Sequence, residues 1–393
     1  MTQIASLPLL VLDAMPRQRG QIHGETLADR IQTHLERWLH FLGEETGLEP
    51  RRYLRQFLAD TDFISAAEKW TPDLLEELRG IAEGSRADFD LILARMLSDE
   101  EPWYRLGVKF GDGIFGEHCS ALGVYEPGQP HPIIAQNMDT AFVMDGSQVV
   151  LHIKEPGSPV EALVFTAAGK ISLCGLNNFG VGICCNTLLQ LDYCTGGLAE
   201  DFVVRGALQQ RSLADALAFM RRIEHASGQI YIIGGREGIV DLECSAHKVV
   251  EQRPLPQVNR FFHTNHPLAN DDQAIFKRRL VRHGEANRRQ LASSTTTYDR
   301  YATLQKKAGD LTTALTLERI KEILRTHEGG APICIDRGAG KLVTLGSLIM
   351  ELGERPVLHA AGGPPCSTPY QVFSFSLFSL FSSFSSFATG DHS

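Results

Sequence analysis

The sequence lacks the features that mark nucleic-acid binding, secretion or membrane insertion. It has no basic excess, because 38 Lys and Arg face 47 Asp and Glu and the formal net charge is -9. Such a chain offers no positive field to phosphate backbones or anionic lipid, so we expect neither nucleic acid nor a membrane as partner. The first twenty residues, MTQIASLPLLVLDAMPRQRG, contain a short apolar run without a basic segment before it. We therefore expect no signal peptide and a cytoplasmic location.

The eight cysteines include no C-x2-C pair of the kind that zinc sites use. Most of them lie in apolar runs such as VGICCNTL and APICI, which is typical of reduced, buried thiols in a cytosolic protein. A metal site built from Cys174, Cys184, Cys185 and Cys194 is the alternative interpretation, and the missing pair weighs against it. We expect no metal and no redox cofactor.

Two halves of the chain differ in their hydrophobic period. Between residues 20 and 110 the apolar residues recur at helical spacing, as in GETLADRIQTHLERWLHFL, whereas from Cys119 onward short β-rich runs alternate with Pro and Gly turns. Helices return later, and the chain finishes with predicted strands in PICID, KLVTLGSLIMEL and RPVLHAAGG. This order predicts an α+β protein in which helices cover the outside of two stacked sheets.

The last segment, residues 371–393, is a Ser/Phe low-complexity sequence unlike the rest of the chain. It is too short and too rich in serine for a membrane span. We expect its first residues to add a terminal strand and assign no chemistry to the remainder.

Cys119 stands where the helical half gives way to the β-rich half, in GEHCSALGV. Downstream follow AQNMD, ending at Asp139, GLNNFGVGICCN, ending at Asn186, and FHTNHP around Asn265. Taken singly, each has an ordinary explanation: a buried core thiol, a turn residue or a loop network. If Cys119 is a nucleophile, it needs a base nearby, because a reference pKa of about 8.5 leaves a thiol mostly protonated at neutral pH.

In order and spacing these blocks resemble the acyl-coenzyme A:6-aminopenicillanic acid acyltransferase family, the C45 peptidase family, whose members are Ntn hydrolases. The resemblance runs from RGQIHGE to HAAGG, which is most of the chain. It implies a four-layer αββα sandwich with a helical N-terminal segment, and a precursor that cleaves its own His118–Cys119 bond. The product would be an αβ heterodimer, able to oligomerise further, of residues 1–118 and a catalytic chain of residues 119–370 followed by the tail.

Cleavage would give Cys119 a free α-amino group with a reference pKa of about 7.7–8.0, which can act as base for its own thiol. The resemblance implies that Asn265 stabilises the oxyanion, that Asp139 orients the α-amine and that Asn186 adds a polar contact. The expected activity is cleavage of an amide through a Cys119 thioester, followed by acyl transfer to water or an amine. A coenzyme A thioester could serve as acyl donor substrate, and no cofactor is expected.

The sequence departs from the family pattern in two places. His118 stands where the better-known members have Gly before the nucleophile, and we expect it to assist processing. The basic residue that the penicillin enzyme carries near its last strands falls at Lys341, with Arg300, in a segment similar to the bile-salt hydrolase branch, as its rival. We expect the substrate pocket to be lined by the N-terminal helices and by the loop from Phe142 to Asp145.

Two alternative functions stay open. A papain-like thiol hydrolase would pair Cys119 with one of the fourteen histidines and remain active as an intact chain. A non-catalytic binding protein with the same fold would not need Cys119 at all. His263 and His266, which flank Asn265, also invite a metal interpretation, but no third ligand follows in a recognised pattern.

Overall fold

The structure, a computed structural model, describes residues 6–108, 119–255, 259–291, 295–310, 312–328, 331–338 and 341–375. Its strands form two sheets. The eight-stranded sheet has the order β1 (Leu9–Asp13), β4 (Gln148–Lys154), β5 (Ala162–Ala167), β6 (Cys174–Asn177), β7 (Gly182–Thr187), β8 (Gln229–Gly235), β9 (Gly238–Cys244), β10 (Val249–Gln252). The six-stranded sheet has the order β11 (Arg260–His263), β2 (Ser120–Val124), β3 (Ile133–Ala141), β12 (Leu342–Glu351), β13 (Val357–Ala361), β14 (Gln371–Ser374). Neighbouring strands are antiparallel except that β1 runs parallel to β4.

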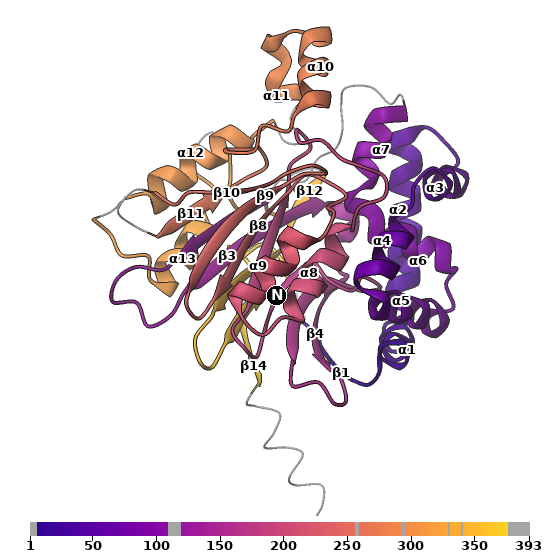
Figure 1. The fold of residues 1–393 in the computed structure, drawn as a ribbon, viewed down its shortest axis with the longest axis horizontal. Coiled ribbons are helices and arrows are strands. Elements are labelled where there is room, and N and C mark those ends of the chain that lie inside the picture. The colour runs from indigo at the N-terminus through magenta and orange to yellow at the C-terminus, as the bar shows by residue number, and fades with distance from the viewer. Residues whose placement is uncertain are drawn as a thin grey trace, which may run out of the picture.

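The helices fall into an N-terminal group and two later pairs, with a small projecting unit (Figure 1). The N-terminal group consists of α1 (Pro16–Thr26), α2 (Ala28–Thr46), α3 (Pro50–Ala59), α4 (Phe63–Trp70), α5 (Pro72–Ser85), α6 (Phe89–Met96), the 3-10 turn η1 (Leu97–Asp99) and α7 (Glu101–Val108). The pairs are α8 (Glu200–Leu208) with α9 (Leu213–Arg222), and α12 (Thr297–Ala308) with α13 (Leu317–Leu324). The projecting unit is α10 (Ala274–His283), η3 (Glu285–Asn287) and α11 (Arg288–Leu291).

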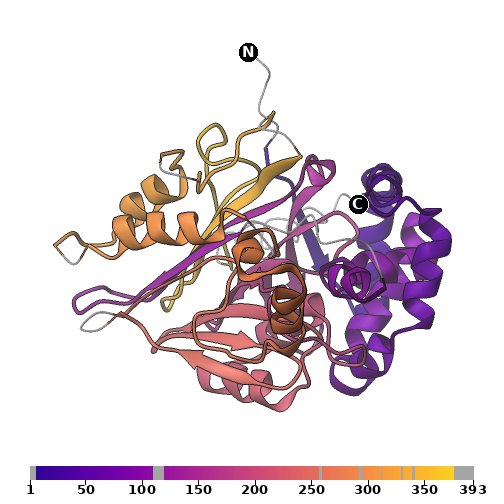
Figure 2. The same cartoon turned by 90° about the horizontal axis from the view of Figure 1, so that it is seen from above.

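Both faces of the six-stranded sheet are buried, which makes the molecule four layers deep. Along β3, Ile134 and Met138 face the core between the two sheets, whereas Ile133 and Ala135 face the core under α12 and α13. This alternation follows from the period of two along a strand. The eight-stranded sheet is covered on its outer face by α8, α9 and the N-terminal helices, and Figure 2 shows the resulting layers. The predicted αββα sandwich is confirmed.

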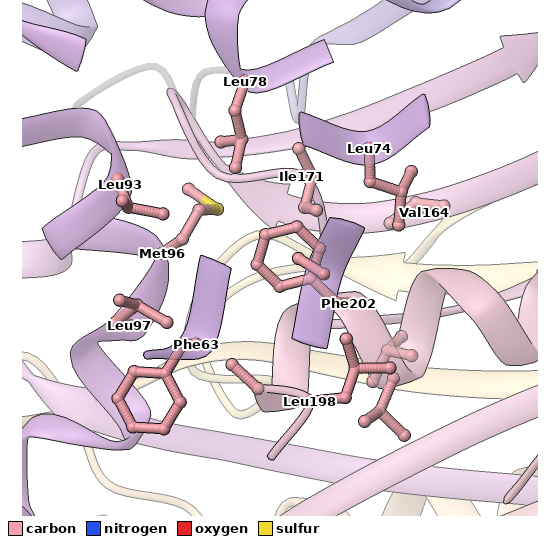
Figure 3. Packing of buried hydrophobic residues seen from close by; sticks show 14 of the residues in the cluster. Phe63, Leu74, Leu78, Leu93, Met96, Leu97, Val164, Ile171, Leu198 and Phe202 are labelled. Atoms are coloured by element: carbon pink, nitrogen blue, oxygen red, sulfur yellow. The ribbon is translucent and has the colours of Figure 1, made fainter. Parts of the chain in front are cut away.

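The N-terminal helices belong to the same hydrophobic core as the eight-stranded sheet. Their apolar stripes meet residues of β5 and of the segments around α8 in a continuous cluster (Figure 3). The labelled members from the helical group are Phe63, Leu74, Leu78, Leu93, Met96 and Leu97, and they pack with Val164, Ile171, Leu198 and Phe202.

Two glycines let α1 and α5 pack in backbone contact. A Cβ on Gly20 would lie 1.9 Å from the carbonyl oxygen of Glu77, and a Cβ on Gly80 would lie 2.0 Å from that of Arg17. No side chain larger than hydrogen fits at either place, because both obstacles are backbone atoms. The close packing brings Arg19 of α1 onto the Glu77 side chain.

One predicted strand is wrong and one is confirmed. The PICID segment is not a strand, because the N–H groups of Ile333 and Cys334 both donate to the carbonyl of Thr326 and so hook the chain into a loop. The terminal strand expected at the start of residues 371–393 is present as β14, which pairs with β13. Residue His118 and residues 376–393 lie outside the described part of the chain. Within the described residues, no helix is long and apolar enough to cross a bilayer.

Candidate active site

Cys119 lies immediately before β2, an inner strand of the six-stranded sheet between β11 and β3. Its side chain is 1% exposed and faces the core between the two sheets, together with Ala121 and Met138. The sulfur lies 3.9 Å from the backbone carbonyl oxygen of Asp139. The residue next along the strand, Ser120, points to the opposite face of the sheet, as the alternation of a strand requires.

On that opposite face, Arg300 of α12 joins three parts of the site. Its guanidinium donates to the carbonyl oxygen of Cys119 at 2.5 Å and to the Ser120 hydroxyl at 2.9 Å, and also to Asn265 Oδ1 at 2.7 Å. Burial lowers the pKa of Arg300 to about 10, although the charges of Asp139 and Cys119 oppose the change. Arg300 therefore stays a cation at neutral pH.

Asp139 is fully buried in β3 and is only partly satisfied. Its Oδ1 accepts a hydrogen bond from the Thr344 hydroxyl at 2.5 Å, while among the described residues its Oδ2 has no hydrogen-bond partner. Burial raises the pKa of Asp139 to about 7, against the lowering effects of the Thr344 hydrogen bond and the Arg300 charge. A carboxyl with this pKa can change its protonation state near neutral pH.

Asn265 lies in the loop after β11 and is held at both ends of its side-chain amide. Arg300 fixes the oxygen, and Nδ2 donates to the carbonyl of Thr187 at 3.1 Å. The backbone N–H donates to the Thr297 hydroxyl at 2.8 Å. Because Arg300 holds the oxygen, the donor end of the amide faces the eight-stranded sheet, where Thr187 ends β7.

The two flanking histidines form the framework of this loop. His263 Nε2 lies 2.8 Å from Glu243 Oε1, and His266 Nδ1 lies 2.8 Å from the Thr297 hydroxyl. Burial lowers the pKa of His266 to about 3. His263 keeps a raised pKa despite its burial, because Asp241 and Glu243 stabilise its charged form. These contacts favour the loop-network interpretation of the histidines over the metal interpretation.

The remaining predicted residues are placed less centrally. Asn186 Nδ2 donates to the carbonyls of His263 and Thr264, so it helps to hold the loop that carries Asn265. Lys341 is exposed and pairs with Glu45 at 3.0 Å, so it is Arg300 that supplies the basic group beside Cys119.

A cleft reaches the inter-sheet core from the N-terminal helices. Its inner residues, Met138, Leu173 and Leu345, belong to the same core as Cys119, and Thr187 joins them. The outer wall comes from α2, α6 and α7 and from the 3-10 turn η2 (Phe142–Met144).

The expected Phe142–Asp145 lining is partly corrected. Val143 and Met144 line the cleft, whereas Phe142 is 45% exposed and does not, because successive residues of a 3-10 turn point in different directions.

Four cysteines weighed as metal ligands are free thiols, and within the described residues no grouping able to hold a metal includes them. Cys185 lies 2.6 Å from Glu200 Oε1, and Cys194 lies 3.4 Å from the carbonyl of His225. Cys174, Cys184 and Cys185 are buried, as the sequence interpretation of core thiols predicts, whereas Cys194 is partly exposed.

Two residues of the site had no sequence signal. Thr344 reaches Asp139 because β12 pairs with β3 in a register that sets the two residues opposite each other. Thr297 begins α12 and anchors both Asn265 and His266. Both are ordinary threonines in their local sequence, and only long-range pairing gives them a role.

A four-layer αββα sandwich is the fold of the Ntn hydrolases. The sequence matches the model of the family described as acyl-coenzyme A:6-aminopenicillanic acid acyl-transferase over residues 126–355, more than half of the chain. The chain therefore belongs to this acyl-transferase family. The match begins downstream of Cys119.

Solved structures resemble the chain only weakly, and a search of curated proteins finds no match. A mutant of conjugated bile acid hydrolase from Clostridium perfringens is 12% identical with a TM-score of 0.42, covering 65% of this chain and 93% of that one. Penicillin V acylase from Agrobacterium tumefaciens is 11% identical with a TM-score of 0.39, covering 65% and 85% respectively. The family assignment rests on the family model.

Proposed function

We propose that the protein is a precursor that cuts its own chain before Cys119 and then works as an N-terminal-cysteine amide hydrolase or acyltransferase. The Cys119 sulfur attacks the carbonyl carbon of an amide and forms a tetrahedral oxyanion. Collapse breaks the C–N bond, releases the amine with a proton taken from the α-ammonium group, and leaves an acyl thioester. Water or a second amine then takes the acyl group and restores the thiol.

The unsatisfied Oδ2 of Asp139 carries the proposal. Leaving a buried carboxylate oxygen without a partner is costly, so such a group in a native protein calls for an explanation. The Asp139 backbone carbonyl already contacts the Cys119 sulfur. An α-ammonium group formed at Cys119 by chain cleavage would supply the missing hydrogen bond and the opposite charge.

Arg300 supports the same assignment from the other side. By holding the Cys119 carbonyl, it fixes the first residue of the new chain, and by holding Asn265 Oδ1 it orients the amide nitrogen as a donor. A donor oriented before the reaction stabilises an oxyanion without reorganisation at the moment of attack. We assign the oxyanion contact to Asn265 Nδ2.

The cleft indicates where the acyl group lies. Its aromatic and aliphatic wall, including Trp38, Phe41 and Val143, suits an acyl group with an apolar body, while Arg95 and Lys170 add polar contacts deeper in. We propose that this cleft takes the acyl part of the substrate.

Cleavage before Cys119 would divide the protein into two chains. Residues 1–118 become one chain and residues 119–370, with the tail of residues 371–393, become the other, in an αβ heterodimer. The two would stay together through the shared core, the β1–β4 pairing and the buried bridge from Arg205 to Glu77. The role of His118 in processing remains a sequence prediction.

The test is the intact mass and N-terminal sequence of the purified protein beside Cys119→Ala, with Cys194→Ala as matched control. We expect two fragments in the wild type and the control, one of them beginning CSALG, and a single full-length chain in Cys119→Ala.

An uncut wild-type chain that loses amide cleavage in Cys119→Ala would point to the papain-like alternative. An uncut wild-type chain that cleaves no amide would point to a binding protein. Both outcomes would refute the proposed α-amine base.

A further inference from the structure

A second pair of thiols lies outside the active site. Cys334 is buried in the loop of residues 331–338, Cys366 is exposed in the loop after β13, and their sulfurs are 3.3 Å apart. His327, just after α13, brings a ring nitrogen so that this nitrogen and the two sulfurs all lie within 4.8 Å of one another. The Asp336 carboxylate lies beside this group, with Oδ1 3.2 Å from the Cys366 sulfur, but its oxygens are not among the atoms that all lie within 4.8 Å of one another.

We propose that His327, Cys334 and Cys366 form a structural zinc site, and that the Asp336 side chain turns from the Cys366 sulfur onto the metal as fourth ligand. Two thiolates, an imidazole and a carboxylate are ligands that Zn²⁺ takes in tetrahedral geometry, at about 2.3 Å for sulfur and about 2.0–2.2 Å for nitrogen and oxygen. The sulfurs of such a site lie roughly 3.8 Å apart, as those bond lengths and a tetrahedral angle require. The observed separation of 3.3 Å is close to that value and far longer than a disulfide bond of about 2.05 Å.

The backbone already gathers the ligands. The carbonyl of Thr326 accepts hydrogen bonds from the N–H groups of both Ile333 and Cys334, which folds the loop back beside His327. A turn in which Ser367 and Thr368 donate to the carbonyl of Pro364 presents Cys366 from the other side. The ligands therefore come from three segments that local hydrogen bonds hold together.

The surrounding charges suit a bound dication with three anionic ligands, which would carry a net charge of -1. Arg325 donates to the carbonyl of Pro365, next to Cys366, at 3.1 Å, and Arg337 follows Asp336 directly and donates to the carbonyl of Gly362 at 3.4 Å. Arg337 also pairs with Asp145 at 2.7 Å, so part of its charge is already balanced. The bound metal itself would supply the positive charge that turns the two thiols into thiolates, the form of cysteine that binds metal.

The proposed zinc site would help to position Asp139 in the active site. Ile335, which follows Cys334, donates its N–H to the Thr344 hydroxyl at 2.8 Å, and the same hydroxyl donates to Asp139. A metal that fixes the loop would therefore fix the group that holds Asp139. It would not take part in the reaction, because no ligand contacts Cys119.

The experiment is a Co²⁺ titration of the full chain, purified with a reductant and stripped with a chelator. We expect one equivalent to bind with the visible and thiolate-to-cobalt bands of tetrahedral sulfur coordination, and Zn²⁺ to abolish them. Cys366→Ser should remove at least half of the thiolate band, and His327→Ala should weaken binding by about 10-fold or more. Cys194→Ser and Cys119→Ala are the controls and should leave the bands unchanged.

Several results would overturn the site. They are the absence of cobalt bands in the reduced wild type, the same bands in Cys366→Ser, or their loss in Cys119→Ala. A further contradicting result combines two observations: without reductant the protein loses two free thiols and two mass units, and after reduction it still shows no cobalt bands. That result would assign Cys334 and Cys366 to a redox pair instead. Because Cys366 is exposed, its serine variant should fold, and circular dichroism checks this.

Discussion

Two carboxylates, Glu77 and Asp139, are equally buried and yet shifted in opposite directions. Glu77 accepts hydrogen bonds from Arg19 of α1 and from Arg205 of α8 on both of its oxygens. Burial alone would raise the pKa of Glu77, but the two guanidinium groups lower it to about 2. Asp139 has one hydroxyl contact and a more distant Arg300, and burial raises its pKa to about 7.

The difference separates a structural charge from one that our proposal assigns to the reaction. Glu77 is fully satisfied and connects α5, α1 and α8, so its charge contributes to holding the helical segment on the sandwich. Asp139 is left incomplete beside the residue proposed as nucleophile. In our proposal the α-ammonium group of Cys119 supplies the partner that Asp139 lacks.

The largest expected effect is the loss of the satisfied charge. In a Cys119→Ala background, Glu77→Gln should lower the free energy of unfolding by about 3–5 kcal/mol at pH 7, because it removes the negative charge buried between Arg19 and Arg205 and leaves Arg19 with only the more distant Glu155. Urea unfolding measures this change. The control is Glu83→Gln on the same helix, whose exposed pair with Arg17 should matter little. Equal losses in the two variants would remove the contrast on which the structural role of Glu77 rests.

The second effect concerns catalysis. Asn265→Ala should lower kcat by about 10²–10³-fold, or about 2.7–4 kcal/mol, as expected for the loss of one oxyanion donor. Steady-state kinetics on processed protein measure it, with Phe142→Ala as control because that exposed ring does not line the cleft. A raised KM with unchanged kcat would assign Asn265 to substrate binding instead.

A smaller effect is expected at Thr344. Thr344→Val removes the hydroxyl that donates to Asp139 and accepts from Ile335, so unfolding should become easier by about 1–3 kcal/mol. The acidic limb of the activity profile should move to higher pH, because the hydrogen bond lowers the pKa of Asp139. Thr344→Ser keeps the hydroxyl and should restore both properties. A serine variant that behaves like valine would show that the methyl group, and not the hydroxyl, matters.

The sequence predicted the layers and three residues of the site for one reason: the hydrophobic period and the order of the blocks are local features. Cys119, Asp139 and Asn265 could be named. In the structure Arg300 joins Cys119 to Asn265, and the backbone carbonyl of Asp139 contacts the Cys119 sulfur. Arg300 itself could not be preferred over Lys341. Its place depends on how α12 packs across the outer face of the sheet, 181 residues from Cys119.

Other features depend on packing that no short window of sequence contains. The PICID run has the composition of a strand, but Thr326 captures its N–H groups and it becomes the loop that holds Cys334. In the sequence Glu77 is an ordinary glutamate of a predicted helix. Its role depends on the contact with Arg205 of α8, which lies 128 residues away in sequence.

The most direct test of the contrast is the pH dependence of unfolding. Because folding raises the pKa of Asp139 from 3.8 to about 7, its contribution to stability is fully present below pH 3.8 and is lost as the pH rises through 7. Urea unfolding of Cys119→Ala and of the double variant Cys119→Ala with Asp139→Asn, from pH 4 to pH 8, isolates this contribution. We predict that, from pH 4 to pH 8, the free energy of unfolding of the chain that keeps Asp139 falls by about 4 kcal/mol relative to that of the double variant. The account would be contradicted if the difference in unfolding free energy between the two chains stayed constant with pH. It would also be contradicted if the chain that keeps Asp139 became the more stable of the two as the pH rises.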